Sequence, residues 1–395
     1  MASPRPPWRR VLVVVVPVAS GLALVGVQVG PMFALTAPDF GVFSLAYLLF
    51  ALGTSLTLSI VCEASLTARG HSGAAGPRSW DTPWTRYGSV LTAISAIVAL
   101  GVLAIIAALR GPLDSLLASS AAFTAVLWQG ARYYELGGGR LGRVVVGDAL
   151  AGGVAITAWV LVTVTGGGDL STALLIWLVS GLVAVAAVRR WPAWNLGALR
   201  PWIDERRHSI RHLLRDSAVM DASAVGTPLV LAPLLGTAGF GVYRGVSNLA
   251  APVRLLLNPV RPLIATWSQT VPSSRLAAFF ALLGALSGSL GYVTLRAVSP
   301  HLSAGTVLGE VAGLAAPTAL FMAANMAGHA AYIVVRSRPP SAAILVPRLW
   351  QTGMGVAGPF IGLLLGGLEG AVWGFAVAST ISALHWLHFM SRHQV

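Results

Sequence analysis

Three arginines lie in one apolar segment of the chain, where a charged side chain is costly. Arg244, Arg254 and Arg261 all fall within residues 239–262, which otherwise have the composition of a membrane-spanning helix. An ionisable residue at the middle of such a helix costs at least about 2.5 kcal/mol, so it normally faces a partner or a wet cavity. A guanidinium stays charged in a dry site and binds phosphate oxygens through paired hydrogen bonds. The arginines therefore predict a site for a phosphate-bearing ligand.

Other polar residues of this segment share one face with the arginines. At 100° per residue, six polar side chains fall within about 140° of the helix circumference. Arg261 is the sixth of these residues. Its side chain either belongs to the same site or extends to the cytoplasmic headgroups. The positions 200 residues earlier are Ser44, Thr54 and Val61, so the cations occur in the second copy alone. The predicted phosphate-binding residues are Arg244, Ser247, Asn248, Arg254 and Asn258.

Two carboxylates and one amide are candidate companions of these arginines. Asp221 and Asp148 each lie near the cytoplasmic end of a predicted helix. Either carboxylate can neutralise an arginine or relay a proton, and neutralisation is the simpler role. Gln28 is the most polar side chain of the first predicted helix and is a candidate cavity residue.

A second polar face occurs in the predicted helix over residues 307–334. Asn325, His329 and Tyr332 are spaced by four and three residues, which places them on one side of a helix. Asn325 and His329 are candidate polar residues of the cavity. His329 has an ordinary pKa near neutrality, although a packed, hydrogen-bonded histidine fits the same pattern. Arg348, early in the next helix, is predicted to extend toward the inner leaflet.

The composition places the chain in a membrane. Hydrophobic residues make up 56% of it and charged residues 10%, against about 25% charged in a typical soluble domain. Many apolar runs approach the roughly 20 residues that a helix needs to cross the hydrocarbon core. The single cysteine, Cys62, excludes an intrachain disulfide. The sequence therefore predicts an all-α polytopic membrane protein.

We predict twelve membrane-spanning helices from these apolar runs. Short turns follow the odd-numbered helices, near Pro38, Gly111, Gly167, Gly236, His301 and Gly367. The connections after the even-numbered helices are longer or richer in arginine. The predicted helices cover residues 11–33, 40–64, 86–109, 113–134, 143–165, 171–188, 216–235, 239–262, 273–297, 307–334, 341–365 and 368–390.

The arginines also orient these helices. With the N-terminus inside, 21 of the 26 arginines fall in cytoplasmic segments and only Arg110 and Arg296 fall outside. This asymmetry is what the positive-inside rule predicts. The sequence therefore predicts a multi-pass protein of the cytoplasmic (inner) membrane with both termini in the cytoplasm. The net charge of +13 is mostly this signal, so no nucleic-acid partner is expected.

A short repeat relates the two halves of the chain. DFGVFSLAY occupies residues 39–47, and GFGVYRGVS occupies residues 239–247. Each copy follows a short turn and opens an even-numbered helix of a group of six. Because six is even, both groups enter the membrane from the same side, which predicts parallel repeats.

The repeat divides the chain into two lobes with a linker. We predict an N-terminal six-helix lobe at 1–188, a cytoplasmic linker at 189–215 and a C-terminal six-helix lobe at 216–395. The linker contains a weakly amphipathic helix that is expected to lie on the inner leaflet. Its apolar residues are Trp202, Ile203, Ile210, Leu213 and Leu214. Trp80, Trp84 and Trp202 are predicted to anchor the chain at the interface.

Three stretches together resemble a known superfamily. They are TAPDFGVFSLAYLLFALGTSLTLSI at 36–60, WQGARYYELGGGRLGRVVVGDAL at 128–150 and GTAGFGVYRGVSNLAAPVRLLLNPVRPL at 236–263. With the twelve-helix plan, they resemble the multidrug/oligosaccharidyl-lipid/polysaccharide (MATE-like) exporters, and among these the polysaccharide, O-antigen-type flippases. The resemblance implies two parallel six-helix lobes around a central cavity with alternating access. Drug-exporting members usually carry an acidic residue in helix 1, which is absent from 11–33 here.

These features favour a flippase for a lipid-linked oligosaccharide or polysaccharide precursor, or a similar amphipathic phosphate lipid. The partners would be that lipid, the bilayer and the glycosyltransferases that build the saccharide. A drug or secondary-metabolite exporter on the same fold is the alternative. A membrane-embedded glycosyltransferase or polymerase is disfavoured because the predicted outer loops are short. No nucleotide-binding, metal-binding or paired-carboxylate motif occurs, so neither an enzyme nor a cofactor is expected.

Overall fold

The fold of the chain is built from helices. A computed structural model describes residues 7–65, 82–250, 253, 257, 264, 271–302, 305–336 and 345–392. Within these ranges the chain contains helices and turns and no β-strand longer than the single bridge between Thr36 and Thr306. The prediction of an all-α chain is confirmed.

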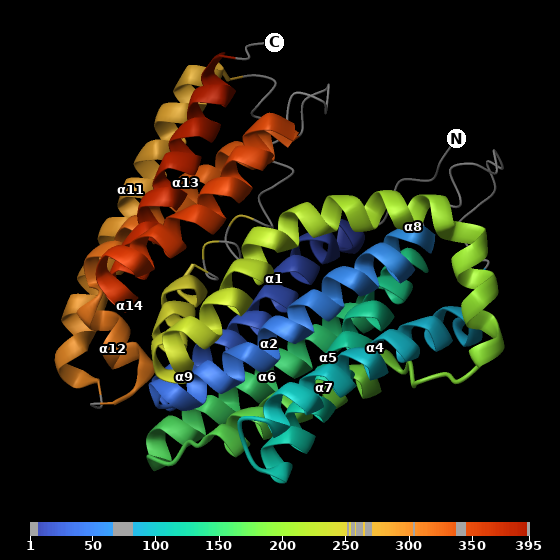
Figure 1. Cartoon of the computed structure of the whole chain (residues 1–395). Helices are drawn as coiled ribbons and strands as arrows, with labels where there is room; N and C mark the ends of the chain where they lie inside the picture. The colour runs from blue at the N-terminus through green and yellow to red at the C-terminus, as the bar shows by residue number, and fades with distance from the viewer. Residues whose placement is uncertain are drawn as a thin grey trace. The chain divides into compact units, whose positions relative to one another are not determined.

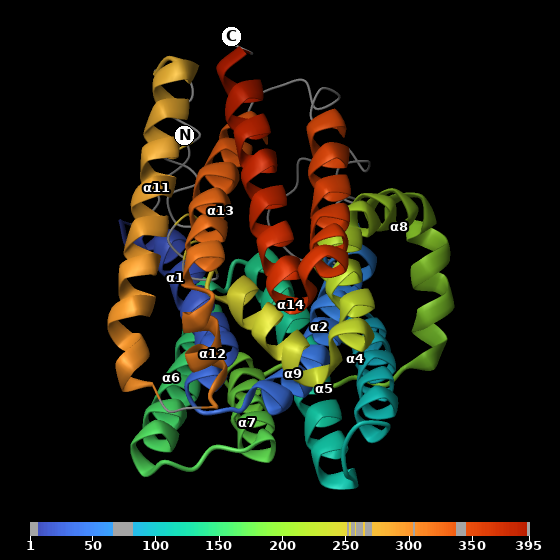
Figure 2. The same cartoon turned by 60° about the vertical axis from the view of Figure 1, so that its left-hand side comes forward.

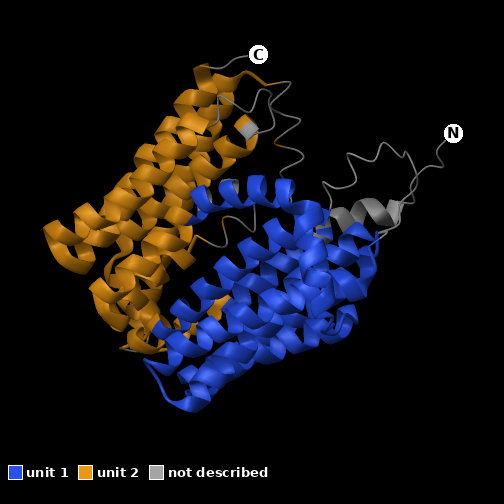
Figure 3. Ribbon diagram, turned by 45° about the vertical axis from the view of Figure 1, so that its right-hand side comes forward, with its two compact units in different colours: residues 1–27, 42–221 blue, residues 28–41, 222–395 orange. Residues whose placement is uncertain are grey.

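The described chain divides into two compact units, which Figure 3 shows in two colours. Unit 1 comprises residues 1–27 and 42–221, and unit 2 comprises residues 28–41 and 222–395. The end of the first helix and the start of the second therefore pack with the C-terminal half. Inside unit 2, the amide of Val307 donates to the carbonyl oxygen of Leu35 at 3.1 Å. The predicted lobes 1–188 and 216–395 follow the repeat rather than these contacts and remain a prediction.

Unit 1 is formed by long helices that pack in sequence-adjacent and next-neighbour pairs. The helix α4 packs on α5, and α7 packs on both α5 and α6 (Figure 1). Its elements are α1 (Pro7–Val29), α2 (Ala37–Thr57) with the π-helical η2 (Leu58–Cys62), α4 (Trp84–Ala107), α5 (Pro112–Gly137), α6 (Leu141–Thr165), α7 (Leu170–Val188), η3 (Leu196–Ala198) and α8 (Leu199–Asp221).

Unit 2 places three long helical elements side by side. The helix α13 packs on α11 and on α14, as Figure 2 shows. The elements are η1 (Gly30–Phe33), η4 (Ala222–Gly226), α9 (Thr227–Asn248), α11 (Ser273–Val298), η5 (Ser299–His301), α12 (Val307–Gly313), α13 (Ala315–Arg336) and α14 (Leu345–Arg392).

Each of the twelve predicted segments overlaps a described helix, although most of residues 249–262 lie outside the described residues. The segment 216–235 combines the end of α8, η4 and the first half of α9, and the segment 307–334 comprises α12 and most of α13. Eight described helices are long and apolar enough to cross a membrane. Two of these contain a break: Gly236 divides α9, and Gly366–Gly367 divide α14. Each break separates two predicted segments. The remaining two segments are α1 and α5. The helix α5 is less apolar than the eight candidate spans, but it is 26 residues long.

Glycine produces the reversal inside α14. Gly367 has φ 59°, a left-handed conformation that costs glycine little. The two halves of α14 then pack closely. A Cβ added to Gly362 would overlap the carbonyl oxygen of Gly370, and a Cβ added to Gly370 would overlap the carbonyl oxygen of Gly362. Small residues of this kind let membrane helices approach each other.

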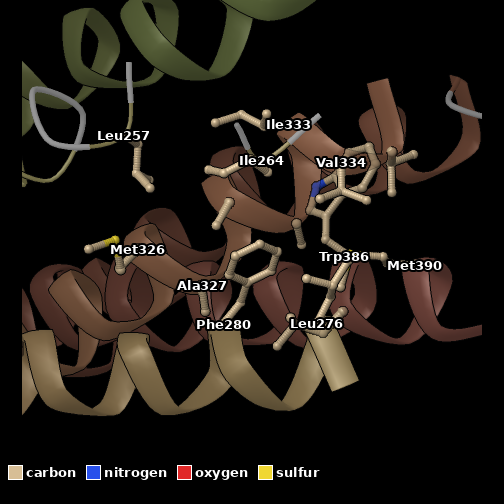
Figure 4. Close-up of a cluster of buried hydrophobic side chains, with 14 of the residues drawn as sticks. Leu257, Ile264, Leu276, Phe280, Met326, Ala327, Ile333, Val334, Trp386 and Met390 are labelled. Carbon is tan, nitrogen blue, oxygen red and sulfur yellow. The ribbon is translucent and has the colours of Figure 1, made fainter. Parts of the chain in front are cut away.

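Each unit has its own apolar core. In unit 2, Phe280 of α11, Ala327 of α13 and Trp386 of α14 meet in one cluster of buried residues (Figure 4). In unit 1, Leu91 of α4 and Leu127 of α5 share a cluster with Trp202 of α8. The linker helix thus supplies a core residue to unit 1.

The two copies of the repeat meet in unit 2. A Cβ on Gly41 would overlap the carbonyl oxygen of Thr237, and a Cβ on Gly241 would overlap the carbonyl oxygen of Ala37. Gly41 and Gly241 are 200 positions apart, and so are Ala37 and Thr237. Each glycine therefore meets the residue equivalent to the one that its counterpart meets, as in the isologous contact of a two-fold axis. The repeated Phe-Gly pair therefore marks a helix crossing that only glycine permits.

Candidate functional site

The candidate site centres on Arg244 in the second half of α9. This half begins after Gly236, so Arg244 lies about 10 Å along it at 1.5 Å per residue. Arg244 is 9% exposed, and its Nη2 donates to the Oδ1 of Asn248 at 3.3 Å. Ser247 Oγ donates to the Arg244 carbonyl at 2.9 Å. Arg244, Ser247 and Asn248 are thus joined by hydrogen bonds, and their role in binding phosphate stays a prediction.

The neighbours of Arg244 along the chain fix the rotation of α9. Tyr243 is buried and its ring lies 5.4 Å from that of Phe375 in α14. On Gly245, an added Cβ would lie 2.8 Å from side-chain atoms of Val307 and Val311 in α12. Because both neighbours are packed against other helices, the direction of the Arg244 side chain is set by the fold.

The rest of the predicted arginine face lies outside the described residues. Arg254, Asn258 and Arg261 belong to it, and their place relative to Arg244 remains a prediction. The first-copy equivalents are described. Ser44 is buried, and neither its hydroxyl nor that of Thr54 has a hydrogen-bond partner among the described residues.

The candidate charge partners have separate environments. Asp148 in α6 is fully buried and accepts a hydrogen bond from the Nε of Arg132 in α5 at 2.9 Å. Its carboxylate is therefore engaged within unit 1, in the neutralising role weighed above. Asp221 is the last residue of α8 and is half-buried, with no ion pair in the described part of the chain.

The polar face of α13 forms part of a network in unit 2. The rings of His329 and Tyr332 lie 6.3 Å apart, so the predicted shared face is present. Arg348 donates from Nη2 to the hydroxyl of Tyr332, whereas the sequence suggested a side chain that extends to the leaflet alone. The Oδ1 of Asn325 is buried without a hydrogen-bond partner among the described residues. Gln28 is half-buried at the end of α1.

One buried charge cluster was not foreseen from the sequence. Glu135 at the end of α5 is fully buried and lies between three arginines. Arg190 Nε donates to it at 2.6 Å and Arg140 Nη1 at 3.2 Å, and Arg143 Nη1 is 3.6 Å away. The string ELGGGRLGR contains two of these arginines, and that spacing was the available signal. The cluster joins the ends of α5 and α7 to the start of α6.

The described residues contain no group of three or more histidine, cysteine or acidic side chains placed to hold a metal. Outside the spans, Glu205 of α8 forms an ion pair with Arg86. The hydrogen bond from Arg86 lowers the pKa of Glu205. The described polar groups around Arg244 are the amide of Asn248 and the hydroxyl of Ser247.

Comparison with known proteins identifies the fold. No protein-family model and no curated protein matches the chain. A multidrug resistance MATE family transporter of the MOP superfamily, in an inward-facing conformation, matches 96% of this chain and 94% of its own with 13% identity and a TM-score of 0.62. The chain has the MATE-type fold.

Two further structures share this fold. The lipid II flippase MurJ, in an inward closed conformation, matches 94% of this chain and 86% of its own with 11% identity and a TM-score of 0.63. A MATE structure in complex with MaL6 matches 96% and 95% with 13% identity and a TM-score of 0.57. The resemblance predicted from the repeat is thus confirmed at the level of the MATE-type fold, and the chain is a multi-pass membrane protein.

Proposed function

We propose that the chain is a flippase that moves a lipid-linked oligosaccharide, or a related amphipathic phosphate lipid, across the cytoplasmic membrane by alternating access. The observation that carries this proposal is Arg244, a buried guanidinium fixed beside Asn248 on α9. A permanent cation in a dry site suits a pyrophosphate. The MATE-type fold, which a lipid II flippase also has, supplies the transport framework.

The absence of acidic residues from the first helix also supports this proposal. Residues 11–33 contain no carboxylate, so a cation-coupled drug exchange that relies on such a group is disfavoured. In this view the protein catalyses no covalent reaction and needs no cofactor. Its partners are the bilayer, the phosphate lipid and the glycosyltransferases that assemble the saccharide.

The test is transport by the purified chain in proteoliposomes. A labelled polyprenyl-pyrophosphate saccharide should reach the opposite leaflet at least about tenfold faster than in protein-free vesicles. The same vesicles should show no protein-dependent release of a small organic cation such as ethidium. Ethidium transport without lipid flipping would instead support the small-molecule exporter that shares this fold, and would overturn the flippase.

We propose that both termini lie in the cytoplasm, and reporter fusions test this orientation. Fusions at His71, Gly138 and Arg206 should report the cytoplasm, because these segments carry most of the arginines. Fusions at Gly167 and His301 should report the exterior. A cytoplasmic signal at Gly167 would contradict the six-plus-six arrangement, since the orientation of every later helix would reverse.

A further inference from the structure

The linker helix α8 carries a row of exposed arginines on one face. Arg200, Arg207, Arg211 and Arg215 are all exposed, and at 100° per residue they fall within about 80° of the circumference. The Arg200 side chain is 94% exposed, with Asp204 as a weak neighbour at 3.8 Å. We call these four residues the arginine stripe.

The opposite face of α8 fixes the direction of the arginine stripe. Trp202 is fully buried, and its Nε1 donates to the carbonyl oxygen of Ile60 at 2.9 Å. Ile210 is also buried. Arg206 lies with its guanidinium 3.9 Å from the Trp202 ring centroid. The prediction that Trp202 is an interfacial anchor was therefore wrong, because it is a core residue of unit 1.

The acidic residues near α8 leave the arginine stripe largely uncompensated. Glu205 accepts hydrogen bonds from Arg86 of α4 and from Arg206. The contact with Arg86 lies on the side of α8 that faces α4. Among the acidic side chains that the structure describes on α8, Asp204 lies close to the stripe, 3.8 Å from Arg200.

Large apolar side chains are exposed just before the arginine stripe. Trp191, Trp194 and Leu196 are 59%, 66% and 72% exposed. Their segment is held against α4, because Trp84 Nε1 donates to the Trp191 carbonyl at 3.0 Å and the Ala193 amide donates to Thr92 Oγ1 at 3.2 Å. Thr92 lies about 12 Å along α4 from Trp84. The exposed tryptophans therefore lie beside the first turns of a candidate membrane span.

We propose that residues 191–215 bind anionic phospholipid headgroups of the leaflet at this end of α4, which the predicted topology makes the cytoplasmic leaflet. Tryptophan rings favour the headgroup level of a bilayer, and outward arginines attract anionic lipids over zwitterionic ones. An aqueous surface would not favour three large exposed apolar side chains beside a membrane span. This inference is independent of the transported substrate, so it stands or fails separately from the flippase proposal.

The single cysteine of the chain permits a site-specific test. Cys62 is buried, whereas Ile203 is half exposed on α8, so an Ile203→Cys variant in a Cys62→Ser background can be labelled with bimane. The full-length protein in detergent is titrated with dioctanoyl phosphatidylglycerol and with dioctanoyl phosphatidylcholine. The fluorescence change should occur at much lower concentration with phosphatidylglycerol, and added salt should weaken that binding.

Charge variants of the arginine stripe measure how much it contributes to phosphatidylglycerol binding. Each arginine near an anionic surface contributes about fivefold to binding, so R207Q/R211Q should weaken phosphatidylglycerol binding roughly 25-fold and leave phosphatidylcholine binding unchanged. R207K/R211K should retain most of the binding because it retains the charge. R110Q/R296Q, which alters the partly buried Arg110 in the turn after α4 and the exposed Arg296 of α11, should have no effect. The single R211Q, with a fivefold loss, serves if the double variant does not fold.

Several results would overturn the inference. Equal binding of the two lipids by the parent protein would show that headgroup charge is not recognised. Unchanged phosphatidylglycerol binding in R207Q/R211Q, or an equal loss in R110Q/R296Q, would remove the arginine stripe from the interaction. A bimane signal that responds to neither lipid would show that neither headgroup binds at this face.

Discussion

Arg244→Ala should slow flipping of a polyprenyl-pyrophosphate saccharide in proteoliposomes strongly while leaving the amount of protein in the membrane largely unchanged. A hydrogen bond to a charged group contributes about 1.5–3 kcal/mol, so we expect a loss of roughly tenfold to a hundredfold. The Arg244, Arg254 double variant should lose more. Insertion should not suffer, because removal of a charge from a span favours insertion.

The conservative and matched variants separate binding from structure. Arg244→Lys should restore flipping only partly, because an ammonium keeps the charge but lacks the planar pair of donors. Ser44→Ala, at the equivalent position of the first copy, removes a hydroxyl without a partner in the described residues and should flip normally. Normal flipping by the Arg244→Ala, Arg254→Ala protein would refute the cationic site. Loss of protein from the membrane would show that Arg244 is structural.

The helices and their breaks could be predicted from sequence because their signals are local. Apolar runs of membrane-spanning length require only a few residues of context. The breaks at Gly236 and Gly367 follow from glycine, since both residues have positive φ. The repeat also gave correct equivalences, because Gly41 and Gly241 occupy matching places at one crossing.

The partners of buried charges could not be predicted in the same way. Periodicity shows which residues share a face of a helix, but not which helix lies opposite that face. Asp148 pairs with Arg132 across α5 and α6, and Glu135 gathers arginines from two further segments. The same limit explains Trp202. Its place on the apolar face of α8 was evident, but only packing shows that this face meets unit 1 and leaves Trp191 and Trp194 exposed.

Gly41→Ala and Gly241→Ala should each destabilise the protein by about 3 kcal/mol or more, at the severe end of overpacking. At either position the new methyl group would overlap a backbone carbonyl oxygen, of Thr237 or Ala37. No rotamer change can relieve a contact between a Cβ and the backbone, so the helices must separate. The measurement is the thermal unfolding midpoint of the purified protein in detergent, followed by size-exclusion chromatography.

The double variant tests whether the two glycines form one contact. If Gly41→Ala has already forced α2 and α9 apart, Gly241→Ala meets less resistance, and the double variant should cost little more than one single variant. Gly101→Ala and Gly153→Ala are matched controls, since a Cβ at these helical positions meets nothing within 4 Å. They should be neutral or stabilising by about 0.5–1 kcal/mol. Additive losses in the double variant would show two independent sites, and stability equal to the controls would show that the crossing tolerates a side chain.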